Sequence, residues 1–189
     1  MTRNQLFAAL TLLLAPAAAF AHPGHGQGLL AGAGHPLGGL DHLLAMVAVG
    51  LWAAQQEGRG RWALPCTFLA SMPVGGALGF AGVNLPGLES GIAASVLALG
   101  LAVALAVRPP LPLAMLATAG FAVCHGMAHG LELPAMASAW TYAAGFIVAT
   151  AALHGAGYAL ARWMPRAAAP LVRLAGLGAA IAGGYLLAA

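Results

Sequence analysis

Six residues of the types that bind metal ions lie in two clusters within an otherwise apolar sequence. The first cluster occupies residues 35–42 (HPLGGLDH) and the second residues 125–132 (HGMAHGLE). An ionisable side chain costs about 2.5–3.5 kcal/mol at the centre of a membrane helix, so such clusters indicate function. Imidazole and carboxylate together favour nickel, cobalt or zinc over magnesium or calcium, and copper(I) is disfavoured because no thiolate cluster accompanies them. The candidate metal ligands are His35, Asp41, His42, His125, His129 and Glu132.

The spacing of the second cluster predicts one stripe on a helix. His125, His129 and Glu132 are four and three residues apart, so all three project from the same face. Because the rise from the first to the last is only ~10 Å, the two histidines can share one ion while Glu132 receives it nearer the surface or supports a ligand. Gly126 and Gly130 permit close approach of a partner helix. An alternative interpretation is that these are buried histidines bonded to carbonyls, with a glutamate at a helix end.

The first cluster is typical of a helix whose first turn is bent. Pro36 suits the first position of a helix, and Gly38 and Gly39 loosen the opening turn. Irregular backbone at membrane depth is tolerated mainly where it faces protein or a wet cavity. Asp41 could instead cap the helix, with His42 as an interfacial residue. If both clusters bind one ion, Asp41 and Glu132 balance a charge of 2+, which lowers the cost of burying it.

The composition predicts an integral membrane protein. Of the 189 residues, 61% are hydrophobic and 6% are charged, and the mean hydropathy is +0.89. The 27 glycines suit close packing of membrane helices, as in the pairs Gly75 with Gly79 and Gly126 with Gly130. No polybasic patch for nucleic acid is present. Because both cysteines fall inside predicted spans, a structural disulfide is not indicated.

The chain divides into a leader, a short segment and a membrane domain. Residues 1–21 have a charged start, an apolar core too short to span a membrane and an Ala-Phe-Ala cleavage motif. These features predict a cleaved signal peptide, and an uncleaved first helix is the alternative. Residues 22–36 are expected to form a periplasmic N-terminal segment. Residues 37–189 predict an all-α, compact bundle of six transmembrane helices. Their expected bounds are 37–55, 62–82, 89–107, 111–131, 135–161 and 168–188.

The arginines predict the orientation of this bundle. With the mature N-terminus outside, every arginine after the leader falls at a cytoplasmic helix end, as the positive-inside rule requires. We therefore expect the inner membrane of a bacterium, with both mature termini periplasmic. Both ligand clusters then lie in the outer half of the membrane, and they meet if the first and fourth helices are neighbours. The arginines concerned are Arg59, Arg61, Arg108, Arg162, Arg166 and Arg173.

Taken together, the two segments resemble the signature motifs of the HupE/UreJ family of nickel and cobalt permeases. The first matches as His-x5-Asp-His, and the second as His-Gly-Met-Ala-His-Gly-Leu-Glu. The resemblance covers essentially the whole mature chain. It implies secondary uptake of Ni2+ or Co2+ to supply enzymes such as hydrogenase or urease, with the six clustered residues at signature positions. Cys124 departs from the family pattern, which has an aromatic residue before His-Gly.

Three further histidines and two other function classes complete the expectations. His22 and His25 could capture metal outside the membrane, or belong to a tail without function. His154 is expected to pack with a hydrogen bond, and a role as an inner metal ligand is the alternative.

A zinc-dependent intramembrane hydrolase is disfavoured because Gly126 occupies the position where a zinc protease has its glutamate. A haem-binding electron carrier could use His42 and His125 as axial ligands, but the clustered carboxylates are unfavourable for such a pair. We expect a transporter rather than an enzyme, with Zn2+ as a third candidate metal and a homo-oligomer as a possible assembly.

Overall fold

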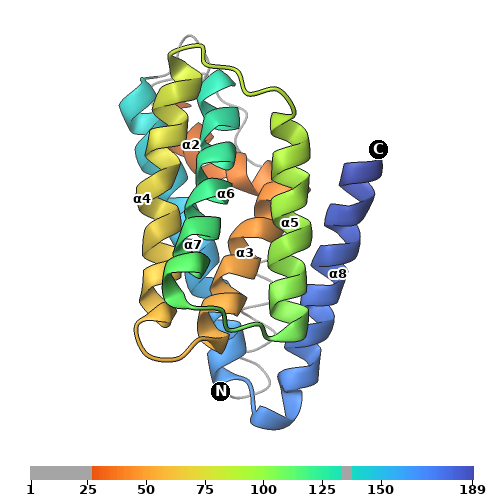
Figure 1. Cartoon of the computed structure of the whole chain (residues 1–189). Helices are drawn as coiled ribbons and strands as arrows, with labels where there is room; N and C mark the ends of the chain where they lie inside the picture. The colour runs from red at the N-terminus through yellow and green to blue at the C-terminus, as the bar shows by residue number, and fades with distance from the viewer. Residues whose placement is uncertain (1–26, 133–137) are drawn as a thin grey trace.

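The computed structural model describes residues 27–132 and 138–189, and in this part of the chain every regular element is a helix, without a strand (Figure 1). A short 3-10 helix, Arg166–Ala168, precedes the last α-helix. The all-α prediction is therefore confirmed for these residues, whereas the predicted signal peptide lies outside them. The helices are α2 (Gln27–Gly38), α3 (Leu40–Gln55), α4 (Gly60–Phe80), α5 (Leu88–Leu105), α6 (Leu111–Leu131), α7 (Ala139–Trp163) and α8 (Ala169–Ala188).

Five of these helices, α4 to α8, are each long and apolar enough to cross a membrane. They contain 18 to 25 residues, against the about 20 that a span requires. Their bounds lie within a few residues of the predicted ones, and α6 coincides with its prediction. A sixth span is obtained if α2 and α3 count as one broken helix. The fold is thus a multi-pass helical membrane protein.

The N-terminal helix differs from the prediction of one helix starting at residue 37. Helix α2 begins ten residues earlier, and α3 turns away from it by 85° at Gly39. Pro36 lies inside α2, so its placement at a first helical position was wrong. Gly39 has φ −100° and ψ 124°, an extended conformation that ends one helix and caps the next. The bend itself, which the glycines predicted, is present.

Glycines bring α4 and α6 into backbone contact, as the small-residue spacing predicted. A Cβ atom on Gly75 would lie 2.1 Å from the carbonyl oxygen of Val123, and one on Gly126 would lie 2.0 Å from that of Met72. Gly79 and Gly130 make equivalent contacts one turn further on. Such distances exclude any side chain, so the two helices run side by side along their length (Figure 1). This pairing fixes the position of the helix that carries the second ligand cluster.

The other close pairs are α3 with α7, α2 with α7, and α5 with α8. Gly50 of α3 and Gly157 of α7 each meet the backbone of the opposite helix, where an added Cβ would clash. Helix α7 therefore packs against both halves of the bent N-terminal pair. The buried core runs between these helices and includes Met46, Phe68 and Val96.

The arginines gather at one end of the bundle. Helices α3, α5 and α7 end there and α4, α6 and α8 begin there, at the bottom of Figure 1. Hydrogen bonds hold α3 to the end of α5 at this level: the Trp52 indole N–H donates to the carbonyl of Val107 (2.8 Å) and the Gln55 amide donates to that of Val103 (3.0 Å). Arg108 forms an ion pair with Glu57. The ligand clusters lie toward the opposite end.

Candidate metal centre

Two motifs more than 80 residues apart in the sequence meet in the interior. The imidazole ring of His42, on α3, lies with its centroid 4.6 Å from that of His125 and 4.3 Å from that of His129, both on α6. The backbones of α3 and α6 pack chiefly on α7 and α4, respectively. The histidine side chains therefore fill the space between these two helices.

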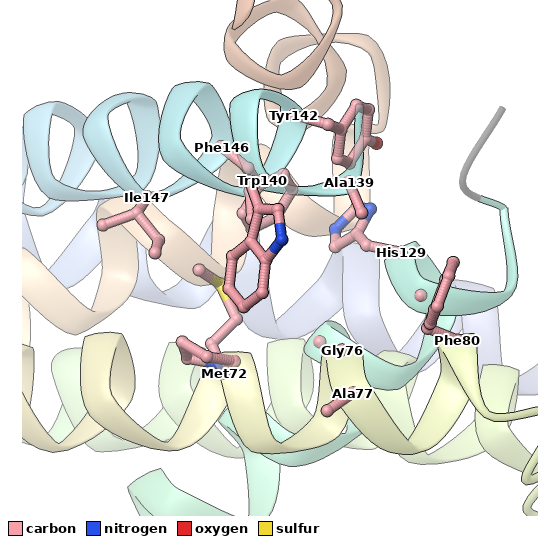
Figure 2. A pocket seen from close by; sticks show the side chains of 14 residues that line it. Met72, Gly76, Ala77, Phe80, His129, Ala139, Trp140, Tyr142, Phe146 and Ile147 are labelled. Atoms are coloured by element: carbon pink, nitrogen blue, oxygen red, sulfur yellow. The ribbon is translucent and has the colours of Figure 1, made fainter. Parts of the chain in front are cut away.

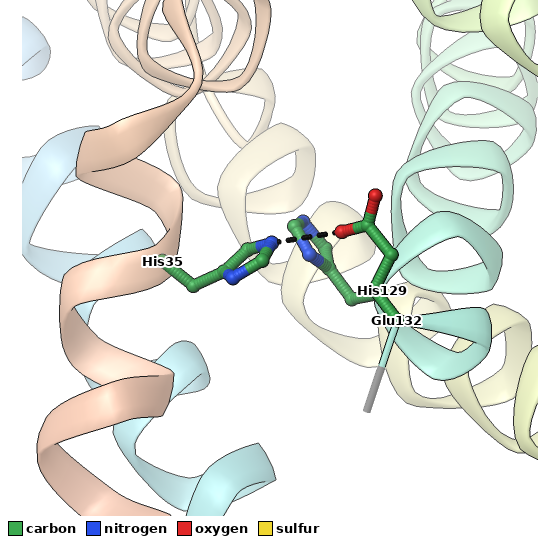
Figure 3. Close-up of side chains that lie close together, drawn as sticks. All are labelled: His35, His129 and Glu132. Carbon is green, nitrogen blue, oxygen red and sulfur yellow. Dashed lines mark hydrogen bonds and ion pairs between the residues drawn. The ribbon is translucent and has the colours of Figure 1, made fainter. Parts of the chain in front are cut away.

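A second group of ligand-type side chains lies at the outer mouth of the same region. Nε2 of His35 is 3.0 Å from Oε2 of Glu132, and the centroid of the His35 ring is 4.6 Å from that of His129. One ligand atom from each of these three residues falls within 4.8 Å of the others (Figure 3). The side chains of His35 and Glu132 are 36% and 58% exposed, whereas His129 is buried. This group can therefore receive an ion from solvent and place it against a buried histidine.

Asp41 fixes the orientation of the His42 ring. Its Oδ1 accepts a bond from the backbone N–H of His42 (2.7 Å) and lies 2.9 Å from Nδ1 of the same residue. The carboxylate thus lies in the first turn of α3, near the positive end of that helix, and also accepts the ring proton. The N-cap residue is Gly39, so Asp41 does not cap the helix. Nε2 of His42 is buried and has no hydrogen-bond partner among the described residues. A neutral ring held in this way presents an unprotonated nitrogen, as a metal ligand must.

Ser95 of α5 plays the equivalent part for His125. Its hydroxyl donates to the carbonyl of Ile92 (2.7 Å) and lies 2.7 Å from Nε2 of His125. Because the single hydroxyl proton is engaged with Ile92, the ring N–H of His125 donates to the Ser95 oxygen. Nδ1 of His125 then carries the lone pair, and it is buried without a partner in the described part of the chain. The sequence reasoning missed Ser95, although a hydroxyl in so apolar a helix was a usable signal.

His129 lies at the centre of the two groups. It contacts His35 and His42 on α2 and α3, and the Phe146 ring of α7 at a centroid distance of 4.0 Å. Both of its ring nitrogens are buried and lack hydrogen-bond partners among the described residues. An imidazole without either bond is costly in a protein interior, by about 1–3 kcal/mol for each group. Bond formation to a cation would remove that cost.

An apolar pocket of about 360 Å3 opens beside His129, between α4, α6 and α7 (Figure 2). Its lining is mostly apolar and includes Met72, Phe80, Trp140 and Phe146 beside His129. Apart from His129, such walls give an ion few ligands. The mouth at Glu132 is therefore the more suitable approach for a hydrated cation.

The remaining candidates from the sequence lie in different places. His154 is buried in α7 at a deeper level, with Nδ1 2.8 Å from the carbonyl of Met46, so the expected hydrogen-bonded packing is observed. Cys124 packs against the cluster around Ile92, away from the histidines, and no disulfide joins it to Cys66. His22 and His25 lie outside the described residues. The six clustered residues thus converge on one region, with Glu132 as the residue that follows α6.

Comparisons with known proteins identify the family of the chain. The family described as HupE / UreJ protein matches residues 10–186. Protein HupE of Rhizobium leguminosarum bv. viciae is 44% identical over 189 residues, which covers 99% of this chain and 99% of that protein. No solved structure matches the chain. On the extent of both sequence matches, this chain belongs to the HupE/UreJ family.

Proposed function

We propose that this protein is a secondary permease for divalent transition-metal ions, with Ni2+ and Co2+ as the favoured substrates. The observation that carries the proposal is the mutual contact of the His42, His125 and His129 rings beside the His35–Glu132 pair, together with buried ring nitrogens on these three residues that have no hydrogen-bond partner among the described residues. Borderline imidazole nitrogens and carboxylate oxygens suit nickel, cobalt and zinc. Asp41 and Glu132 supply two negative charges for an ion of charge 2+, so the occupied site is neutral overall.

The order of burial supports a route for the ion. Glu132 and His35 are accessible and replace the first waters, and His129, His42 and His125 then complete the coordination. Release requires a rearrangement that opens the arginine-bearing end, where Trp52 and Gln55 hold α3 to α5. An inward potential of 100 mV contributes about 4.6 kcal/mol for a 2+ ion. The described chain contains no nucleotide-binding loop, so this potential, a proton gradient or capture of the ion inside the cell would drive uptake.

Orientation and cellular role follow from the same proposal. The arginine-bearing end would face the cytoplasm and the ligand clusters the periplasm, with the protein in the bacterial inner membrane and both mature termini outside. A cleaved leader would expose His22 and His25 as a capturing tail. Metal delivered inward would serve the maturation of hydrogenase or urease, and assembly into a homo-oligomer is compatible with the exposed faces of the bundle.

The other two function classes have less support. A zinc-dependent hydrolase of the zinc-protease type needs a glutamate directly after its first histidine, and Gly126 occupies that position after His125. A haem between His42 and His125 does not fit, because their ring centroids are 4.6 Å apart and the rings are in perpendicular contact. Neither geometry favours catalysis or electron transfer over transport.

The test is metal accumulation in cells that lack other nickel and cobalt uptake systems. Cells with the intact protein should accumulate 63Ni2+, whereas His42→Ala and Glu132→Ala should reduce uptake to the background. Arg59→Ala, at the opposite end of the bundle, is the control and should retain uptake. Competition by Co2+ and Zn2+ ranks the three metals. Equal accumulation by all variants would reject the site, and no accumulation by the intact protein would reject transport.

A further inference from the structure

A fourth buried histidine lies below the metal centre and has no part in the proposed coordination. His154 is 2% exposed, and its ring is bonded through Nδ1 to the carbonyl of Met46. Met46 follows His42 by one turn of α3, which places His154 about 6 Å deeper along that helix. Along α7, His154 lies about 12 Å beyond Phe146, the residue that contacts His129. His154 therefore lies on the inner side of the histidine cluster.

A single aromatic ring contacts both the histidine cluster and His154. The ring of Phe68, on α4, has its centroid 5.8 Å from that of His125 and 5.1 Å from that of His154. Phe68 is fully buried, and its ring offers neither imidazole a hydrogen bond. His125 and His154 therefore share one buried neighbour, the Phe68 ring.

The protonation of His154 follows the pattern of the outer ligands. A carbonyl can only accept, so the Nδ1–H of His154 donates to Met46 and the lone pair resides on Nε2. Nε2 is buried and has no hydrogen-bond partner among the residues that the structure describes. A backbone carbonyl that fixes the tautomer in this way is a common second partner of metal-bound histidines. If His154 served only for packing, this buried nitrogen would remain without a hydrogen bond, which costs about 1–3 kcal/mol of stability.

We propose that Nε2 of His154 is a second, inner station for the transported divalent cation, next to the Phe68 ring that also contacts the outer cluster. The inference rests on the proposed function and adds a step to it: the ion leaves His125, passes Phe68 and is bound by His154 before release. One protein nitrogen holds an ion much less tightly than the outer set of ligands. The inner station is therefore suited to transfer rather than to storage.

Two measurements on His154→Asn separate this role from a structural one. The asparagine amide can still donate to the carbonyl of Met46, but it lacks the nitrogen that would bind metal. Purified His154→Asn should bind Co2+ at the outer cluster with unchanged affinity and unfold at the same temperature. In proteoliposomes that contain a fluorescent chelator, its Co2+ transport should fall by about tenfold or more. Thr150→Val, one turn away on the same buried face of α7, is the control and should transport normally.

A spectroscopic variant tests whether an ion reaches this position. In a background of Cys66→Ala and Cys124→Ala, His154→Cys should give a thiolate-to-Co2+ charge-transfer band in the near ultraviolet. Leu153→Cys, which is also buried but points about 100° away, should give none. Unchanged transport by His154→Asn, or no band in His154→Cys, would overturn the inner station. Absence of transport by the intact protein would instead overturn the proposed function.

Discussion

The backbone contact between α4 and α6 yields a quantitative test of how the candidate metal centre is positioned. A methyl group on Gly126 would begin 2.0 Å from the carbonyl oxygen of Met72 and 3.0 Å from the backbone nitrogen of Gly76. Ordinary contact requires at least 3.4 Å, so Gly126→Ala must separate the helices locally by roughly 1.4 Å. The atoms that obstruct the methyl group are backbone atoms, which cannot rotate away. The strain must therefore move one of the helices.

The expected cost follows from the size of that movement. Overpacking of this kind costs about 1–3 kcal/mol, and here it also displaces His125, the adjacent residue. Ligand atoms displaced by more than about 0.5 Å no longer meet one ion in a productive geometry. Gly126→Ala should therefore lower both the unfolding temperature and the affinity for Ni2+, the latter by about tenfold or more.

The control lies on the same helix. Gly120 has no atom within 4 Å of the position where its Cβ would stand. Gly120→Ala should therefore leave metal binding unchanged, and the unfolding temperature should stay the same or rise because alanine is the better helix former. The assay is thermal unfolding and isothermal titration with Ni2+ on purified protein in detergent. If Gly126→Ala and Gly120→Ala behave alike, the contact between α4 and α6 does not position the ligands as argued.

Two further predictions concern the chemistry of the centre, and a third concerns the ion pair at the arginine-bearing end. Ser95→Ala should weaken Ni2+ binding by about 10–100-fold, because His125 loses the acceptor that fixes its tautomer. Titration calorimetry measures this loss of affinity, and the stability of the protein should change little. Ser95→Thr is the control and should retain the affinity for Ni2+. Acidification should release bound Co2+, followed by absorbance, because a protonated imidazole cannot ligate. Release that is independent of pH would contradict histidine ligation. Arg108→Gln should change the free energy of unfolding by less than about 1 kcal/mol in chemical denaturation, because its pair with Glu57 is exposed.

The helices were predictable from the sequence because lipid imposes a simple rule on them. Long apolar stretches with breaks at proline, glycine and arginine allow few other structures, and α6 was predicted with its observed bounds. Spacing alone also predicted that His125 and His129 share a face. The glycines of α4 and α6 indicated close packing, although their spacing did not reveal that the two sets would meet each other.

The contacts between distant segments were not predictable in the same way. Nothing local to Ser95 or Met46 indicates which histidine each will hold, because the partners lie 30 and 108 residues away in the chain. The start of α2 was missed because its short apolar run, with Pro36 near its end, does not have the length of a span. The helix is stabilised instead by packing on α7, where Gly32 and Gly145 allow backbone contact.

The break at Gly39 explains how one short segment supplies ligands to both levels of the site. In a continuous helix, His35 and His42 would lie on one face and about 10 Å apart along the axis. The 85° turn instead directs His35 across the mouth toward Glu132, while His42 points inward to His125. Both rings then contact His129, at centroid distances of 4.6 Å and 4.3 Å from opposite halves of the bend. A residue at position 39 that extended α2 into α3 would remove one of these two contacts, so the backbone break is as necessary to the convergence as the histidines themselves.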